Sequence, residues 1–154
     1  MPAQEDKGER LNRELIELLN ELRVALPGVQ VLFAFLLAVP FTQRFTEVDR
    51  VQRGAYFACV VFTAIASMLL IAPSAYHRLR WREHDKEHML KTANVLSIAG
   101  TVFLALGMTG VVFLVSDMLF RRGWAAAVAA VIALGFAWFW YGLPLQRRLR
   151  QRAG

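Results

Sequence analysis

Residues 92–116, TANVLSIAGTVFLALGMTGVVFLVS, run for 25 positions without an Asp, Glu, Lys or Arg. A helix rises 1.5 Å per residue, so about 20 apolar residues cross the roughly 30 Å apolar core of a bilayer. Three other uncharged stretches, residues 24–43, 54–76 and 123–146, hold 20, 23 and 24 residues. The sequence therefore predicts four transmembrane helices, of which the longer ones tilt or overhang the bilayer.

All 30 charged residues of the 154-residue chain lie outside these four stretches, and the mean hydropathy is +0.39. Four consecutive uncharged helices of this length would be very unusual in a soluble core. We therefore expect an all-α fold, an integral membrane four-helix antiparallel bundle that forms one domain over residues 1–154. Its spans are expected at about 24–43, 54–76, 92–116 and 123–145, after a cytoplasmic amphipathic helix at 9–23.

The distribution of Lys and Arg among the segments outside the spans predicts the orientation. Thirteen of the 18 bases precede the first span, join the second span to the third, or follow the fourth. The positive-inside rule places this base-rich side in the cytoplasm, so both termini and the central loop are expected there. The net charge of +6 then reflects membrane topology, and nucleic acid is not an expected partner.

Leucines at 11, 15, 18 and 22 recur at helical spacing and predict the amphipathic helix at 9–23. We expect this helix to end near Pro27 and Gly28, because proline would kink a continuous helix. Residues 1–23 hold six carboxylates against four bases, whereas helices that bind membrane surfaces are usually rich in bases. The helix is therefore expected to pack on the basic central loop or to pair with another protomer.

Small residues recur every four positions in three of the spans. They are Ala55, Cys59, Thr63 and Ser67; Ala93, Ser97, Thr101, Ala105 and Thr109; and Ala125, Ala129, Ala133 and Ala137. Small residues let helix backbones approach in a membrane, so these stripes predict the bundle core. The first span has only Ala34 and Ala38 and is expected to be peripheral. We expect the hydroxyls to bond to backbone carbonyls; the alternative is a polar path across the membrane.

The central loop holds all three histidines, His77, His84 and His88, which would share one face of a single helix. His84 and His88 have the spacing of a metal-ligand pair, so they are a candidate metal site. The plainer interpretation is a basic loop on anionic lipid headgroups. The residues expected to contact headgroups are Arg78, Arg80, Arg147, Arg148 and Arg150.

Three polar residues are candidates for function or for polar contacts within the membrane domain. Gln30 follows Pro27 and is expected to bond the backbone that the proline frees. His77 lies where the second span meets the cytoplasm, and a histidine there can titrate near neutral pH. Thr101 would line a shared path if the chain formed an oligomeric channel.

Residues 17–41, ELLNELRVALPGVQVLFAFLLAVPF, and 71–78, IAPSAYHR, resemble an uncharacterised actinobacterial family of small four-helix membrane proteins. The block LRVALPGVQ at 22–30 is the most specific part, and the similarity covers nearly the whole chain. The resemblance implies a multi-pass protein of the bacterial cytoplasmic (inner) membrane. Some members carry the label sodium:proton antiporter. Antiport normally needs a carboxylate within the membrane. Here the nearest is Asp117 at a span end, which we expect to pair with Arg121 and Arg122 or to meet water.

The sequence therefore favours a structural or accessory protein that binds membrane lipids, anionic ones on the cytoplasmic side, or a partner membrane protein. The alternative is a small-ion or proton transporter or channel formed by a homo-oligomer. No nucleophile elbow, phosphate-binding loop or CxxC motif is present, so an enzyme is not expected, and neither is a cofactor.

Overall fold

Four long helices account for most of the chain in the computed structural model, which describes residues 7–79, 86–143 and 146. They are α1 (Lys7–Ala38), α2 (Arg50–Leu79), α3 (Lys86–Leu119) and α4 (Arg122–Phe136). Two short 3-10 helices, η1 (Val39–Phe41) and η2 (Gln43–Glu47), join α1 to α2, and the π-helix η3 (Ala137–Gly142) continues α4. The described residues contain no strand, so the predicted all-α class is confirmed.

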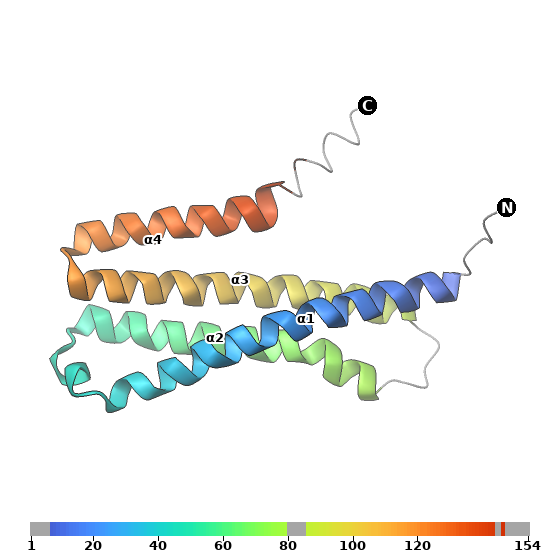
Figure 1. Cartoon of the computed structure of the whole chain (residues 1–154), viewed down its shortest axis with the longest axis horizontal. Helices are drawn as coiled ribbons and strands as arrows, with labels where there is room; N and C mark the ends of the chain where they lie inside the picture. Colours follow the sequence, from blue (N-terminus) through green and yellow to red (C-terminus); the bar gives the residue numbers. More distant parts are fainter. Residues whose placement is uncertain (1–6, 80–85, 144–145, 147–154) are drawn as a thin grey trace.

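Successive long helices run in opposite directions (Figure 1). One end of the molecule holds η1, η2 and the α3–α4 connection, and we call it the loop end. The other end holds the start of α1, the end of α2 and the start of α3, and we call it the terminal end; η3 runs towards this end but stops well short of it.

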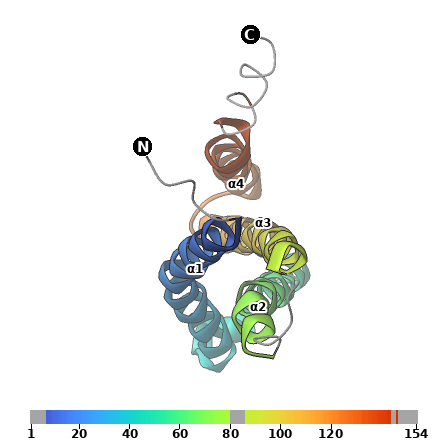
Figure 2. The same cartoon turned by 90° about the vertical axis from the view of Figure 1, so that its right-hand side faces the viewer.

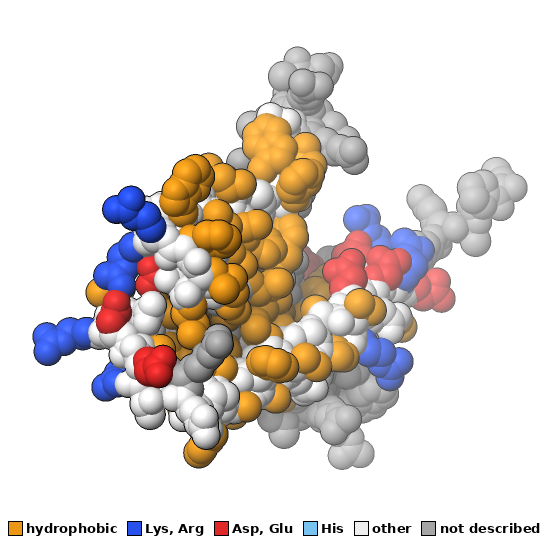
Figure 3. All heavy atoms as spheres, turned by 60° about the vertical axis from the view of Figure 1, so that its left-hand side comes forward, with side chains coloured by type: hydrophobic (Ala, Val, Ile, Leu, Met, Phe, Trp, Pro, Cys, Tyr) orange, Lys and Arg blue, Asp and Glu red, His pale blue; other side chains and the backbone are white. Residues whose placement is uncertain are grey.

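Each of the four helices is long and apolar enough to cross a membrane. Large apolar side chains point outward; the Phe35 side chain, for example, is 74% exposed and Trp124 is 68% exposed. Figure 3 shows hydrophobic side chains over the middle of the molecule and charged ones towards its ends. Such a continuous apolar surface suits lipid and would be a liability in water. The prediction of four helices capable of spanning a membrane is therefore confirmed.

Helix α1 is continuous, so the predicted end near Pro27 and Gly28 is wrong. Its buried side chains, Leu15, Leu22, Val29 and Leu36, recur at every seventh position on both sides of the proline. A repeat of seven residues keeps one seam of a helix against its partners over its whole length. Pro27 lies on the exposed side and removes one backbone hydrogen bond, a loss that membrane helices tolerate when packing holds both halves.

Helices α1, α2 and α3 pack on one another, whereas α4 packs on α3 and, among the described residues, on neither α1 nor α2. Figure 2 shows this arrangement end-on, with α4 on the side where α1 and α3 adjoin and α2 on the opposite side. The prediction that the first helix is peripheral is therefore wrong, and α4 has that position. The reason is side-chain size: α1 buries three leucines and a valine, whereas α4 buries only Ala125 and Ala129.

The α2–α3 interface follows the same seven-residue period. In α2 the buried residues are Cys59, Thr63, Ala66, Leu70 and Pro73, and in α3 they are Ala93, Gly100 and Gly107. The four-residue stripes predicted from the sequence therefore contribute only some of their members. The difference arises because residues spaced four apart shift progressively around the helix. Residues at alternating spacings of three and four stay on the face that contacts the partner helix.

Glycines bring α2 and α3 close together. A Cβ atom built on Gly100 would lie 2.8 Å from side-chain carbons of Leu70, and one on Gly107 would lie 2.8 Å from Thr63 Oγ1. A Cβ on Gly110 would overlap Cys59 Sγ. Because lipid supplies no hydrophobic drive, this close van der Waals contact is what holds the two helices together.

Candidate functional site

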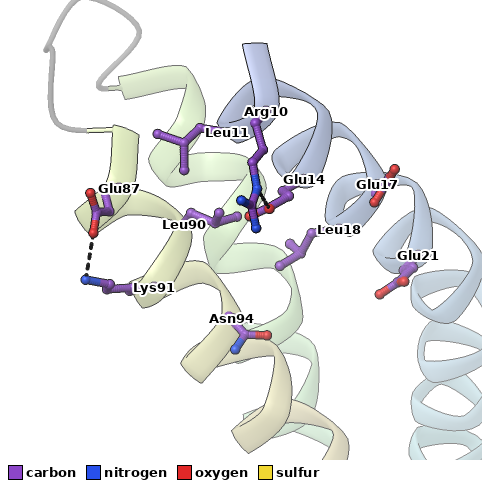
Figure 4. A pocket seen from close by; sticks show the side chains of 10 residues that line it. All are labelled: Arg10, Leu11, Glu14, Glu17, Leu18, Glu21, Glu87, Leu90, Lys91 and Asn94. Atoms are coloured by element: carbon purple, nitrogen blue, oxygen red, sulfur yellow. Dashed lines mark hydrogen bonds and ion pairs between the residues drawn. The ribbon is translucent and has the colours of Figure 1, made fainter. Parts of the chain in front are cut away.

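A groove of about 530 Å³ lies between α1 and α3 at the terminal end. It is lined by Arg10, Leu11, Glu14, Glu17, Leu18 and Glu21 of α1 and by Glu87, Leu90, Lys91 and Asn94 of α3. Figure 4 shows leucines of both helices between the two rows of charged side chains. The groove therefore has a polar rim above an apolar floor.

The groove continues towards the middle of the molecule. A second hollow of about 220 Å³ shares Leu18, Glu21 and Asn94 with the first and extends along α3 to Ser97 and Thr101. Leu70 of α2 also lines this part. We call the two hollows together the α1–α3 groove.

The position of the groove relative to a membrane follows from helix length. Asp117 lies near the loop end of α3, and Ser97 precedes it by 20 residues, which is about 30 Å of helix. A bilayer core measured from Asp117 therefore ends near Ser97. A core placed in this way would leave the charged part of the groove outside it and the Ser97–Thr101 part inside it.

Carboxylates outnumber bases along the groove: four glutamates line it, against Arg10 and Lys91. Arg10 Nε bonds Glu14 Oε1 at 2.9 Å and Lys91 Nζ bonds Glu87 Oε1 at 3.0 Å, both four residues apart on one helix. Glu21, where the two hollows meet, forms no ion pair with a described residue. The groove is therefore acidic on a chain whose net charge is +6.

Hydroxyl groups mark the membrane end of the groove. Thr101 Oγ1 bonds the carbonyl oxygen of Ile98 at 2.8 Å and lies 2.8 Å from the Tyr141 hydroxyl of η3. Ser97 Oγ donates to the carbonyl oxygen of Ala93 at 2.8 Å. The Thr101–Tyr141 hydrogen bond therefore connects η3 to the groove, although α4 itself packs elsewhere on α3.

A polar network closes the loop end. Asp49 caps α2 reciprocally with Gln52, because the Gln52 backbone N–H donates to Asp49 Oδ1 at 2.8 Å and the Asp49 N–H to Gln52 Oε1 at 3.1 Å. Gln52 Nε2 also donates to Asp117 Oδ2 at 2.9 Å. Arg122 Nη2 pairs with Asp49, and its Nε lies 3.3 Å from Asp117 Oδ1.

This network joins α2, α3 and α4. The Asp117 side chain is only 3% exposed, so it needs the donors that Gln52 and Arg122 supply. The hydrogen bond from the Gln52 backbone N–H, and then that from Arg122, hold the pKa of Asp49 below its ordinary value of 3.8. The expected pairing of Asp117 with a neighbouring base is confirmed for Arg122.

The hydroxyls of α2 bond within their own helix. Thr63 Oγ1 donates to the carbonyl oxygen of Cys59 at 2.8 Å, and Ser67 Oγ donates to that of Thr63 at 2.9 Å. Ser97 and Thr101 also bond to carbonyls of their own helix, as predicted. These groups therefore have internal partners and do not need water along the α2–α3 interface.

His77 and His88 lie on different helices, so the expectation that one helix face carries all three histidines is wrong. His77 falls in the last turn of α2 and His88 in the first turn of α3, while His84 lies outside the described residues. A chain reversal between His77 and His88 replaces the single helix that the spacing suggested. Among the residues that the structure describes, no group of three His, Cys, Asp or Glu side chains could hold a metal ion.

The polar candidates are not brought together. Gln30 is exposed on α1, one position after buried Val29, and its side chain makes no hydrogen bond with a described residue. The expected bond to backbone freed by Pro27 is therefore absent there. Thr101 lines the α1–α3 groove, which Gln30 does not line. Arg78 lies in the last turn of α2, where side chains are not described, and Arg80, Arg147, Arg148 and Arg150 lie outside the described residues.

The sequence reasoning missed Asn94 and Glu21 as parts of one groove, and Tyr141 as the hydrogen-bond partner of Thr101. The missing signal was the continuity of α1, which carries Glu21 past the end of the span and alongside α3. A pattern was available for the loop end: an aspartate followed three residues later by glutamine, before an apolar run, is a capping box.

A family model matches residues 4–144, and its description is a family of unknown function, DUF6328. The chain belongs to this family. No curated protein and no solved structure matches the chain. The fold and the α1–α3 groove are therefore those of a DUF6328 member.

Proposed function

We propose that this DUF6328 protein is a structural or accessory protein of the bacterial cytoplasmic membrane, with both termini in the cytoplasm and without catalytic activity or a cofactor. The observation that carries the proposal is the closed α2–α3 interface. Its glycines press against Leu70, Thr63 and Cys59, and the α2 hydroxyls bond within the helix. Such an interface offers no path for an ion or a proton within one protomer.

Lipid binding is the first part of the proposed role. The basic residues Arg78, Arg80, Arg147, Arg148 and Arg150 belong to the base-rich side that the positive-inside rule places in the cytoplasm. Each base near an anionic surface contributes about 1 kcal/mol, so five such bases favour phosphatidylglycerol or cardiolipin over neutral lipid.

A partner membrane protein, or a second copy of the chain, is the second part. Among the described residues, α4 packs on α3 and on neither α1 nor α2, and Val131 and Leu134 of α4 and Trp138 of η3 lie exposed. This helix therefore has free faces for a partner within the membrane. The α1–α3 groove offers a different, polar surface on the cytoplasmic side.

Native mass spectrometry tests the lipid part. The protein in detergent is mixed with equal amounts of phosphatidylglycerol and phosphatidylcholine, and the retained lipids are counted. We expect phosphatidylglycerol to dominate, and the variant with Arg147, Arg148 and Arg150 replaced by Gln to lose that preference. The matched control replaces Arg44, Arg50 and Arg53, on the opposite side, and should keep it. Equal retention of both lipids by the native protein would contradict the proposal.

Ion flux separates this role from the transporter alternative. Proteoliposomes loaded with a pH-sensitive dye are given a sodium or proton gradient, and dye fluorescence is followed against empty liposomes. We expect the two rates to agree. A flux above that of empty liposomes, lost in Thr101→Val, would reject the accessory role and favour an oligomeric channel.

A further inference from the structure

The α1–α3 groove holds an excess of carboxylates in a strongly basic chain, and the role proposed above does not use it. We propose that the groove is the docking site of the chain's own basic C-terminal segment, residues 147–152, RRLRQR. The arginines of this segment would then exchange between lipid headgroups and the groove. The inference goes beyond the proposed function, because it concerns a contact within one protomer that forms without lipid.

The first observation in support is that η3 and the groove run in the same direction. Tyr141 lies 2.8 Å from Thr101, which lines the membrane end of the groove. There η3 points towards the terminal end, and the groove runs towards the same end along α3, from Thr101 through Asn94 to Glu87. The described chain therefore ends close to the membrane end of the groove, with η3 directed along it.

The open side of the groove carries the second step. Leu70 of α2 lines the groove, so its opening faces away from α2. Figure 2 places α4 on that side, over the junction of α1 and α3. Helix α4 and η3 therefore lie on the open side of the groove, so a segment that leads from η3 into the groove does not have to pass around α1 or α3.

Chain length carries the third step. Arg147 and Arg152 follow Tyr141 by 6 and 11 residues, which is about 9 and 16 Å as helix or up to roughly 20 and 36 Å extended. Along α3, Asn94 and Glu87 precede Thr101 by 7 and 14 residues, or about 10 and 21 Å. The arginines can therefore reach the acidic part of the groove in either conformation.

Charge and polarity carry the fourth step. The segment brings four arginines to a groove with four glutamates, of which Glu21 has no ion pair with a described residue. Leu149 stands between the arginines, and the floor of the groove offers Leu11, Leu18 and Leu90. An arginine guanidinium matches a carboxylate in charge and in hydrogen-bond geometry. The arginines of the segment would therefore pair with the glutamates that line the groove.

Cysteine cross-linking of the full-length protein in lipid-free detergent tests the inference. The pair Asn94→Cys with Leu149→Cys is treated with a short bismaleimide, and the product is mapped by mass spectrometry. The matched control moves the first cysteine by one residue, Val95→Cys with Leu149→Cys, onto an α3 side chain that is 63% exposed and does not line the groove. We expect at least a fivefold faster reaction for the Asn94 pair, within the monomer, and loss of the difference in 1 M salt.

Charge reversal keeps the test independent of cysteine reactivity. Glu21→Arg in the Asn94 cross-linking pair should slow the reaction several-fold, and adding Arg148→Glu should restore it. Circular dichroism of each variant confirms that the helices are intact. Equal rates for the two cysteine pairs, or a cross-linked dimer in place of a monomer, would overturn the proposal. Neither result would affect lipid retention or ion flux, so failure here is distinct from failure of the proposed function.

Discussion

Replacing Gly107 by Ala tests the close approach of α2 and α3 directly. The new Cβ atom would lie 2.8 Å from Thr63 Oγ1, about 0.6 Å inside the 3.4 Å at which ordinary contact begins. Thr63 is completely buried, and its hydroxyl is held by a 2.8 Å bond to the carbonyl oxygen of Cys59, so it has no free direction of movement. The helices must therefore move apart.

The expected cost is the difference between two terms. Overpacking of a tight interface costs about 1–3 kcal/mol. Alanine recovers about 0.8–1.0 kcal/mol because it favours the helix more than glycine does. The net change for Gly107→Ala is therefore a loss of about 0–2 kcal/mol in the free energy of unfolding.

Gly135→Ala is the matched control, because no atom lies within 4 Å of a Cβ at that position in α4. This control has the propensity term alone, so the two variants should differ by about 1–3 kcal/mol. The assay is reversible unfolding by sodium dodecyl sulfate in mixed micelles, followed by far-ultraviolet circular dichroism. In a Thr63→Ala background the obstructing hydroxyl is gone, and the difference should shrink. If Gly107→Ala proves as stable as Gly135→Ala, the α2–α3 interface is looser than described.

Three further changes probe other parts of the fold. Tyr141→Phe removes the hydrogen bond to Thr101 and should cost about 0.5–1.5 kcal/mol in the same unfolding assay, whereas no change would show that η3 is not held to α3. The lowered pKa of Asp49 means that its contribution to stability is complete above its ordinary value of 3.8 and is lost as the pH falls through the lower folded-state value. Thermal unfolding should therefore show native protein and Asp49→Asn converging at low pH and separating as the pH rises, while a constant gap would contradict the pairing with Arg122. Pro27→Ala should raise the unfolding free energy, because it restores a backbone hydrogen bond within continuous α1; a loss of stability would mean that the proline shapes the helix.

The candidate site was only partly accessible from the sequence. Asp117 and its neighbouring bases were predicted to pair, because groups three to five residues apart at a helix end meet whatever the tertiary fold. Gln52, by contrast, lies 65 residues from Asp117, and Asp49 lies 73 residues from Arg122. Only the packing of α2 beside α3 brings these groups together. The prediction that the histidines share one helix was wrong for a related reason. A chain reversal separates His77 from His88, although their spacing in the sequence suggested a single helix.

By itself the sequence determined that the chain has four apolar helices and where their charged ends lie. Each uncharged stretch can be compared with the thickness of a bilayer without knowledge of the other segments. The local hydroxyl bonds of Thr63 and Ser67 were also predictable, since a hydroxyl within a helix finds its acceptor in the carbonyl three or four residues back. Tertiary structure alone decided that α1 continues through Pro27, that α4, in the described part of the chain, packs on α3 and not on α1 or α2, and that α1 and α3 form an acidic groove. These outcomes depend on which helix faces fit together, and in a membrane that choice rests on the shapes of two surfaces rather than on the hydropathy of either.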